Sequence, residues 1–415
     1  MKTIRFILII LIAFIPFISF ADDASNLIAV LGVVKDANQR KALESVNVTL
    51  AGSHIGTVTN KDGYFVLKVP KGKFPITLAF THLSYAPTKI EISDVAEAAD
   101  KHVVLMRIIA AQIKEIVVTP VDAEDVVNTA YQKISKNYPD YPTMLSGFYR
   151  ETIQKKKRYI SVAEAVIKAY KPPYTKNPFR QNVQVLKGRK LISPKVSDTL
   201  SVKLMGGPLQ IITFDYVVSQ WPLLEPENLN WYKYYMEEYV MLDGRLHYKI
   251  RFEPRVMADV PLMNGYYYID RETFSIDRIE ASTDMKDEAL VTQQMLKKKP
   301  RGMRFKPQEL SCVVTYKTID GKTYPSYIKN VIRFQCDWKR RLFHTNYTVI
   351  SETVITDHEN NPHEAIAYKN SFKDNDILPD RIEYFLDQDF WKDYNIIEPT
   401  ESLDEAVAKL MKDYK

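Results

Sequence analysis

The residues of this chain that could do chemistry are few, and none of them forms a recognisable catalytic motif. Seven histidines are present, but none belongs to a His-Glu-x-x-His or His-x-x-Glu zinc motif, and no Gly-x-Ser-x-Gly turn offers a serine nucleophile. Cys312 and Cys336 have no histidine close by in the sequence, so core packing is expected for both rather than nucleophilic catalysis. The sequence therefore predicts no catalytic residue and no cofactor.

Metal-capable side chains gather in one polar run, Asp357–Glu364, which contains His358-Glu359 and His363-Glu364. Imidazole and carboxylate groups at this spacing could bind a metal ion. The surrounding asparagines and Pro362 favour a solvated loop instead, so no metal site is predicted.

Aromatic clusters are the better candidates for a binding site. Exposed rings could stack on sugars or line an apolar groove, whereas strands also use aromatic residues simply for packing. The possible ligand-binding residues are Trp231, Tyr232, Tyr234, Tyr235, Tyr266, Tyr267 and Tyr268.

The N-terminus predicts export. A basic start, Met1–Arg5, precedes an apolar run that ends in small residues at Ser19 and Ala21, which is typical of a signal peptide spanning residues 1–21. The run is short for a membrane anchor, and no later stretch reaches membrane-spanning length. The predicted location is the periplasm or the periphery of the outer membrane.

Composition excludes two broad classes. With 46% hydrophobic and 26% charged residues, the chain is globular rather than disordered. Removing Lys2 and Arg5 with the signal peptide lowers the charge from 57 − 51 = +6 to 55 − 51 = +4, which is too weak to predict nucleic-acid binding. Its 415 residues suit two or three domains.

Residues 22–120 predict a small β-sandwich. Short β-rich runs are bounded by turn residues, and the clearest turn is Asn60-Lys61-Asp62-Gly63, where Gly63 is free to adopt a positive φ. The expected runs are 32–34, 46–50, 57–59, 64–67, 76–80, 102–106 and 115–118, before Thr119-Pro120.

This segment resembles the carboxypeptidase regulatory-like domain. The resemblance rests on Gly32–Asp36, Val46–Val48, Gly56–Phe65 and Leu83–Tyr85. It implies a seven-stranded sandwich of the transthyretin (prealbumin) type at the N-terminus of a Gram-negative envelope protein. It implies no peptidase activity of its own.

The rest of the chain predicts a mainly β fold. A linking helix in 121–142 begins at Asp122 and is expected to dock between the domains. Residues 143–368 alternate as strands of a large antiparallel sheet, with hairpin turns at Asp243-Gly244 and Asp320-Gly321. The C-terminal segment 369–415 predicts two helices, one opened by Pro379 and one capped by Ser402.

The two cysteines flank one of these turns. In an oxidising compartment Cys312 and Cys336 could form a disulfide. A hairpin turning at Asp320-Gly321 would place them several residues out of register, so the pairing stays open.

One strand pair of the large sheet, Gly265–Asp270 with Phe274–Ile279, is similar to those of LolA-like lipoprotein carriers. That resemblance implies a curved sheet with a hydrophobic concave face. An outer-membrane barrel is disfavoured because charged residues such as Lys249 and Arg251 lie within the strands.

Three functional hypotheses follow. The first is a non-enzymatic envelope binding or adaptor protein whose partner is a protein, glycan or lipid. The second is a LolA-like carrier of lipid or lipoprotein acyl chains, with a dry apolar cavity on one sheet face. The third is a hydrolase whose site forms only in the fold. Basic runs at 155–158, 297–299 and 339–341 add the alternative of peripheral contact with anionic lipid.

Overall fold

The computed structural model describes residues 26–72, 74–109, 121–175, 181–200, 202–219, 223–338, 344–384 and 390–412. The predicted signal peptide, the strand at 115–118 and the basic run at 339–341 lie outside these ranges. Within them, no helix is both long enough and apolar enough to cross a membrane.

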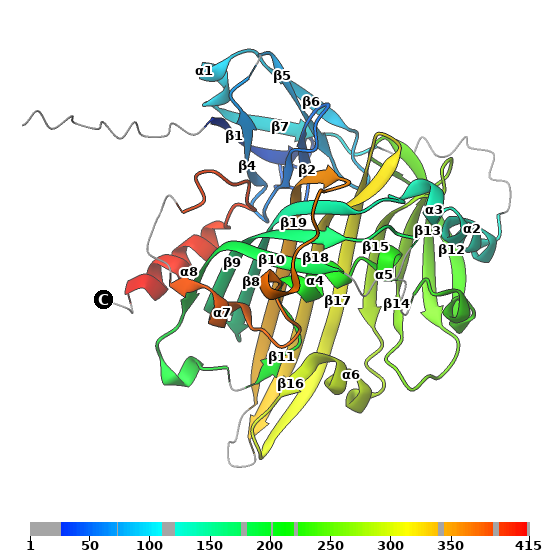
Figure 1. The fold of residues 1–415 in the computed structure, drawn as a ribbon, viewed down its shortest axis with the longest axis vertical. Coiled ribbons are helices and arrows are strands. Elements are labelled where there is room, and N and C mark those ends of the chain that lie inside the picture. Colours follow the sequence, from blue (N-terminus) through cyan, green and yellow to red (C-terminus); the bar gives the residue numbers. More distant parts are fainter. Residues whose placement is uncertain are drawn as a thin grey trace, which may run out of the picture.

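The N-terminal part is a sandwich of two sheets, at the top of Figure 1. One sheet has the order β4-β1-β7 and the other has the order β3-β2-β5-β6. Their inner faces share a core that includes Val30, Phe65, Leu67 and Phe80. The elements are β1 Leu27–Asp36, β2 Asn47–Leu50, β3 Gly56–Val58, β4 Tyr64–Pro70, β5 Ile76–Thr81, β6 Thr88–Ile92, α1 Val95–Ala98 and β7 Lys101–Met106.

The turn predicted at Asn60–Gly63 is confirmed. The side-chain oxygen of Asn60 accepts hydrogen bonds from the backbone N–H groups of Asp62 and Tyr64 at 2.9 and 3.0 Å. Gly63 has φ +75°, and a Cβ there would lie 2.5 Å from the carbonyl oxygen of Val34. Glycine is therefore required both by the backbone conformation and by the close approach of β1.

Residues 143–384 form one large sheet of eleven strands, as predicted from their alternation. The order is β12-β13-β14-β15-β17-β18-β19-β8-β9-β10-β20, and every neighbouring pair is antiparallel except β10 with β20. The strands are β8 Thr143–Lys155, β9 Arg158–Lys171, β10 Asn182–Ile192, β12 Tyr232–Leu242, β13 Arg245–Pro254, β14 Met263–Asp270, β15 Ile276–Thr283, β17 Met303–Ile319, β18 Lys322–Trp338, β19 Thr345–Asn360 and β20 Glu383–Tyr384.

The sheet is strongly twisted, so that β8 and β9 cross the direction of β13–β15 in Figure 1. We call the face that carries Ile250, Phe252 and Tyr267 the inner face, because the helices pack there over the main core. The opposite, outer face carries the alternating Lys249 and Arg251 of β13.

The helices on the inner face are α2 Ala123–Gln132, α3 Ile134–Asn137, α4 Pro208–Thr213 and α5 Tyr216–Ser219, with the 3-10 helix η4 Pro226–Trp231. Asp122 caps α2 as predicted, since its carboxylate accepts from the backbone N–H of Glu124 at 2.7 Å. The expectation that this helix docks between the domains is wrong. Val126, Val127 and the rest of its apolar side belong to the core of the large sheet.

Three more elements lie at the lower end of the molecule in Figure 1. They are a short two-stranded sheet of β11 Lys203–Leu204 with β16 Leu296–Lys298, and the helix α6 Glu288–Met295. A separate apolar cluster, which includes Phe305, Phe334 and Met295, fills this end.

The hairpins at Asp243-Gly244 and Asp320-Gly321 are confirmed. In the second, Cys312 lies opposite Asn330 and Cys336 lies opposite Phe305. Both thiols are free and buried. The register therefore keeps the two cysteines apart.

The C-terminal segment differs from the prediction. The helix expected at Pro379 is the single turn α7 Leu378–Arg381, followed by strand β20. The last helix, α8 Glu401–Lys412, begins earlier than expected, because the hydroxyl of Thr400, not that of Ser402, accepts from the backbone N–H of Leu403.

Between β20 and α8 the chain runs as a strap, residues 390–400, that joins the two sheet systems. On the sandwich side, the side-chain amide of Asn395 bonds both the N–H and the C=O of Lys68 in β4, at 2.7 and 3.0 Å. The hydroxyl of Thr57 donates to the carbonyl of Ile396 at 2.8 Å.

On the large-sheet side, the strap closes over a buried ion network on the outer face. Glu164 pairs with Arg150 at 2.6 Å and with Arg189 at 2.8 Å. Arg150 also donates to the carbonyl of Ile397, and the indole N–H of Trp391 donates to Glu164 at 3.2 Å. Burial alone would raise the pKa of Glu164, but the two guanidinium groups hold it below its ordinary value.

Candidate binding site on the inner face

The inner face is filled in large part by the protein's own chain. Ile211, Ile212, Val217 and Val218 of α4 and α5 are buried against the sheet. Pro208 stands at the first position of α4, where proline suits a helix start. The sequence analysis did not predict these helices, because each is shorter than the window in which helical periodicity can be recognised.

A buried ion network holds this plug in place. Asp215, between α4 and α5, is fully buried and forms an ion pair with Lys171 of β9. The hydroxyl groups of Tyr174 and Tyr316 both donate to Asp215 at 2.7 Å. Burial lowers the pKa of Lys171, although Asp215 opposes this effect. With all its partners in place, Asp215 fixes α4 and α5 against the sheet.

A cavity of about 820 Å³ remains beside the plug. Its apolar lining comes from α4, α5 and the neighbouring chain, through Leu209, Phe214, Met263 and Phe372. Its polar lining comes largely from segment 368–375, and includes Lys373 and Asp374. The volume lies within the range of about 300–1,000 Å³ that is usual for small-molecule sites.

Hydrogen-bonding atoms without partners are concentrated around this cavity. Four of its lining residues, Gln181, Tyr216, Ser219 and Gln294, each carry a buried side-chain oxygen with no hydrogen bond in the described part of the chain. Buried polar atoms are usually paired, so each of these atoms lacks a partner that a ligand or water can supply once a side-chain rotation exposes it. No sequence pattern marks them, because they lie on three separate segments, with Tyr216 and Ser219 both in α5.

The tyrosines predicted to bind a ligand are divided between the two faces. Tyr232 and Tyr267 are buried in the inner core, and Trp231 and Tyr234 pack against it. Tyr267 stacks on Phe252, with ring centroids 4.6 Å apart. These contacts give the inner-face rings a packing role, and none of them lines the cavity described above.

The remaining three lie on the outer face, each beside a cation. Arg251 lies over the ring of Tyr235 at 4.1 Å, and Lys249 over Tyr266 at 5.0 Å. Arg278 lies over Tyr268 at 5.9 Å. The binding role of all seven residues stays a prediction.

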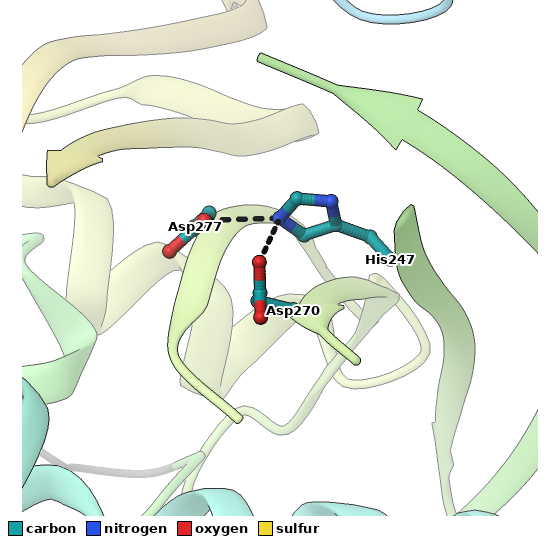
Figure 2. A group of neighbouring side chains, drawn as sticks. All are labelled: His247, Asp270 and Asp277. Atoms are coloured by element: carbon teal, nitrogen blue, oxygen red, sulfur yellow. Dashed lines mark hydrogen bonds and ion pairs between the residues drawn. The ribbon is translucent and has the colours of Figure 1, made fainter. Parts of the chain in front are cut away.

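Among the residues that the structure describes, one group of neighbouring side chains has metal-ligating types, namely His247, Asp270 and Asp277 (Figure 2). His247 Nε2 lies 2.9 Å from Asp277 and 3.9 Å from Asp270, and its Nδ1 lies 2.9 Å from the carbonyl oxygen of Arg245. Each ring nitrogen of His247 therefore already lies within hydrogen-bond distance of a protein oxygen, the Arg245 carbonyl on one side and the Asp277 carboxylate on the other.

A cation is already present in this group. The guanidinium of Arg245 pairs with Asp270 at 2.9 Å and with Asp277 at 2.5 Å. The other oxygen of Asp270 caps the β14–β15 turn by accepting from Thr273. The arrangement is an ion network that fixes this turn, and the geometry does not suit a metal site.

The expectation that His358 lies in a solvated loop is wrong. His358 is in β19, half-buried at the contact with the sandwich, where its ring meets His54 at 3.8 Å and Tyr324 at 4.1 Å between centroids. Burial and the charges of His54 and Lys317 lower the pKa of His358 to about 4. His363 does follow the end of β19, as expected for a loop residue.

Comparison with known proteins identifies the sandwich. A family model for the CarboxypepD_reg-like domain matches residues 30–118. The N-terminal domain is a CarboxypepD_reg-like domain. The match covers this domain alone, and no curated protein sequence matches the chain significantly.

The chain is also distantly similar to solved structures. A DUF1329 family protein from Desulfovibrio piger is 10% identical, covers 60% of this chain and 97% of its own, and has a TM-score of 0.30. A LolA superfamily protein from Nitrosomonas europaea is 11% identical, covers 61% and 99%, and has a TM-score of 0.23. At these TM-scores nothing is transferred from either protein.

Proposed function

We propose that this protein is an exported, non-enzymatic binding protein of the cell envelope that carries an acyl chain in its inner-face cavity. The observation that carries the proposal is the cavity of about 820 Å³ with an apolar floor formed by Leu209, Phe214, Met263 and Phe372. Hydrocarbon gains free energy in such a place because it leaves water.

The polar lining supports a ligand that also has a head group. After small side-chain rotations, the hydroxyl groups of Tyr216 and Ser219 can donate to a ligand carbonyl. The amide oxygens of Gln181 and Gln294 can accept from a ligand amide or hydroxyl. This lining is more polar than that of the dry, apolar cavity expected of a LolA-like carrier. The ligand class that fits is therefore a lipid or an acylated protein, with its chain inward and its polar group beside these oxygens.

The plug limits the size of the cargo. Helices α4 and α5 fill the rest of the inner face and are anchored by Asp215. The free volume suits one or two acyl chains rather than a large lipid assembly.

A cavity-filling variant tests this proposal. Leu209→Trp should place an indole in the cavity and weaken the binding of dansyl-labelled undecanoic acid at least about tenfold, the equivalent of about 1.4 kcal/mol, in a fluorescence titration. The matched control is Val196→Trp, since Val196 is 89% exposed and lies outside the cavity. Equal affinities in the wild type and both variants would overturn the site, as would native mass spectrometry of envelope-purified protein without any bound acyl species.

A further inference from the structure

The register of the large sheet brings basic turns that are far apart in the sequence to one end of the molecule. Lys155, at the tip of the β8–β9 hairpin, lies opposite Tyr347 near the start of β19. Met303, at the start of β17, lies opposite Trp338 at the end of β18. Neighbouring strands are about 4.8 Å apart, so β17 and β8 are separated by roughly 15 Å across the sheet.

Three further segments join this end. Strand β16 pairs with β11 directly before the turn into β17. The 3-10 helix η3 Val196–Asp198 is tied to the β8–β9 hairpin, because Lys155 donates to the carbonyl of Ser197. Lys297 donates to the carbonyl of Asp374. We call the end formed by these segments the basic end, and it comprises residues 151–159, 195–200, 202–205, 284–306, 335–338, 344–347 and 373–376.

The basic end carries the whole formal net charge of the chain. It holds 14 lysines and arginines against 8 aspartates and glutamates, and 14 − 8 = +6 equals the net charge of the full sequence. The remaining residues therefore sum to 43 − 43 = 0. The charge is concentrated at one end rather than spread over the surface.

The acidic groups of the basic end do not neutralise its exposed cations. The buried Asp198 pairs with Lys155 at 3.7 Å and also with Arg158. Asp284 and Glu288 each pair with a lysine of the same end, at 3.1 and 3.9 Å. Four exposed basic side chains form no ion pair within the described residues, namely Lys156, Lys157, Lys298 and Arg301.

The basic end also adjoins the inner-face cavity. Gln294 of α6 and Asp374 both line this cavity, and Lys297, which bonds Asp374, lies in the basic run itself. A bilayer is the place from which an acyl chain is taken and to which it is delivered. Cations spread across two turns match a plane of anionic head groups better than they match a single small anion.

We propose that the basic end docks on the surface of a bilayer that contains anionic phospholipid, through Lys156, Lys157, Lys298 and Arg301. Each lysine or arginine near such a surface contributes about fivefold in affinity. The choice of a lipid surface rests on the proposed acyl binding, because docking at this end would hold the cavity beside the bilayer. The docking contacts themselves lie outside the cavity.

Vesicle co-sedimentation of the full mature chain tests the proposal. Vesicles of equal parts phosphatidylglycerol and phosphatidylcholine should bind the protein at least about tenfold more tightly than vesicles of phosphatidylcholine alone. This preference should disappear in about 1 M NaCl, where the screening length is about 3 Å.

Charge reversal identifies the surface that binds. Lys298→Glu with Arg301→Glu should weaken binding to the anionic vesicles at least about tenfold. The matched control is Lys89→Glu with Lys409→Glu, which changes the net charge equally on exposed residues of β6 and α8, and it should bind nearly as well as the wild type.

The outcomes separate docking from acyl binding. Leu209→Trp fills the cavity but leaves the basic end unchanged, so it should bind vesicles like the wild type whatever the result of the acyl titration. Equal binding to anionic and neutral vesicles, or equal losses in the two double variants, would overturn the proposal. Binding to soluble poly-glutamate without binding to the anionic vesicles would assign the basic end to an acidic protein and would also overturn it.

Discussion

The contact between His358 and His54 makes the stability of the two-domain unit depend on pH. The pKa of His358 is lowered to about 4 from an ordinary value of 6.5, because burial and the charge of His54 both disfavour the protonated ring. A depressed pKa means that the folded protein binds fewer protons than the unfolded chain between these values. The contribution of His358 to the free energy of unfolding is therefore fully present above pH 6.5 and is lost as the pH falls toward 4.

The magnitude follows from the same values. The gap between 4 and 6.5, at about 1.36 kcal/mol for each pKa unit, corresponds to an upper bound of about 3.4 kcal/mol. His358 is only half-buried, so water screens part of this effect. We expect about 1.5–2 kcal/mol of stability to be lost between pH 7 and pH 4 through this residue.

The assay is urea denaturation of the wild type and of His358→Gln across this pH range. Both proteins share every other titrating group, so the difference between their free energies of unfolding isolates His358. The difference should shrink or change sign as the pH falls from 7 to 4. His363→Gln, which changes a histidine in the loop after β19, is the matched control and should follow the wild type. A difference that does not vary with pH would refute this reasoning.

Three further predictions concern the packing. Asp215→Asn leaves the buried Lys171 without its counter-charge and should lower the free energy of unfolding by about 3–5 kcal/mol, measured by denaturation at neutral pH; a loss below about 1 kcal/mol would contradict the role given to this network. Asn395→Ala frees the outer edge of β4 at Lys68, and limited proteolysis should then cut the strap faster than in the wild type, while equal rates would show that the amide contributes little. Cys312 and Cys336 should react with a thiol reagent only after unfolding, since both are buried and burial raises the pKa of Cys336 to about 11; rapid labelling of the folded protein would contradict this.

Local signals in the sequence predicted most of the fold. The turn at Asn60–Gly63, the cap at Asp122 and the hairpins at Asp243-Gly244 and Asp320-Gly321 each depend on residues adjacent in the chain. Alternation was equally reliable in the long strands, because each has one apolar face on a core. Alternation did not predict the end of β19, because the run around His358 is polar. His358 is half-buried there by contact with His54 of the N-terminal domain.

The candidate site could not be predicted in the same way. The cavity is lined by segments around residues 181, 209–219, 263, 294 and 368–375, which only the folded sheet brings together. The plug was missed because α4 and α5 are each little more than one turn long. The tyrosines were predicted to bind a ligand because they are adjacent in the sequence. In a strand, however, adjacent side chains point to opposite faces, so Tyr266 and Tyr267 cannot share one site.

The same argument bears on how the N-terminal domain is used. Family resemblance describes it as a separable module, yet Val58 of β3 is buried in one cluster with Phe148 and Val354 of the large sheet and with Trp391 of the strap. Deleting the domain would expose this cluster and leave the strap without its bonds to β4. A truncated chain would therefore lose partners through damage to the large sheet as well as through loss of the module.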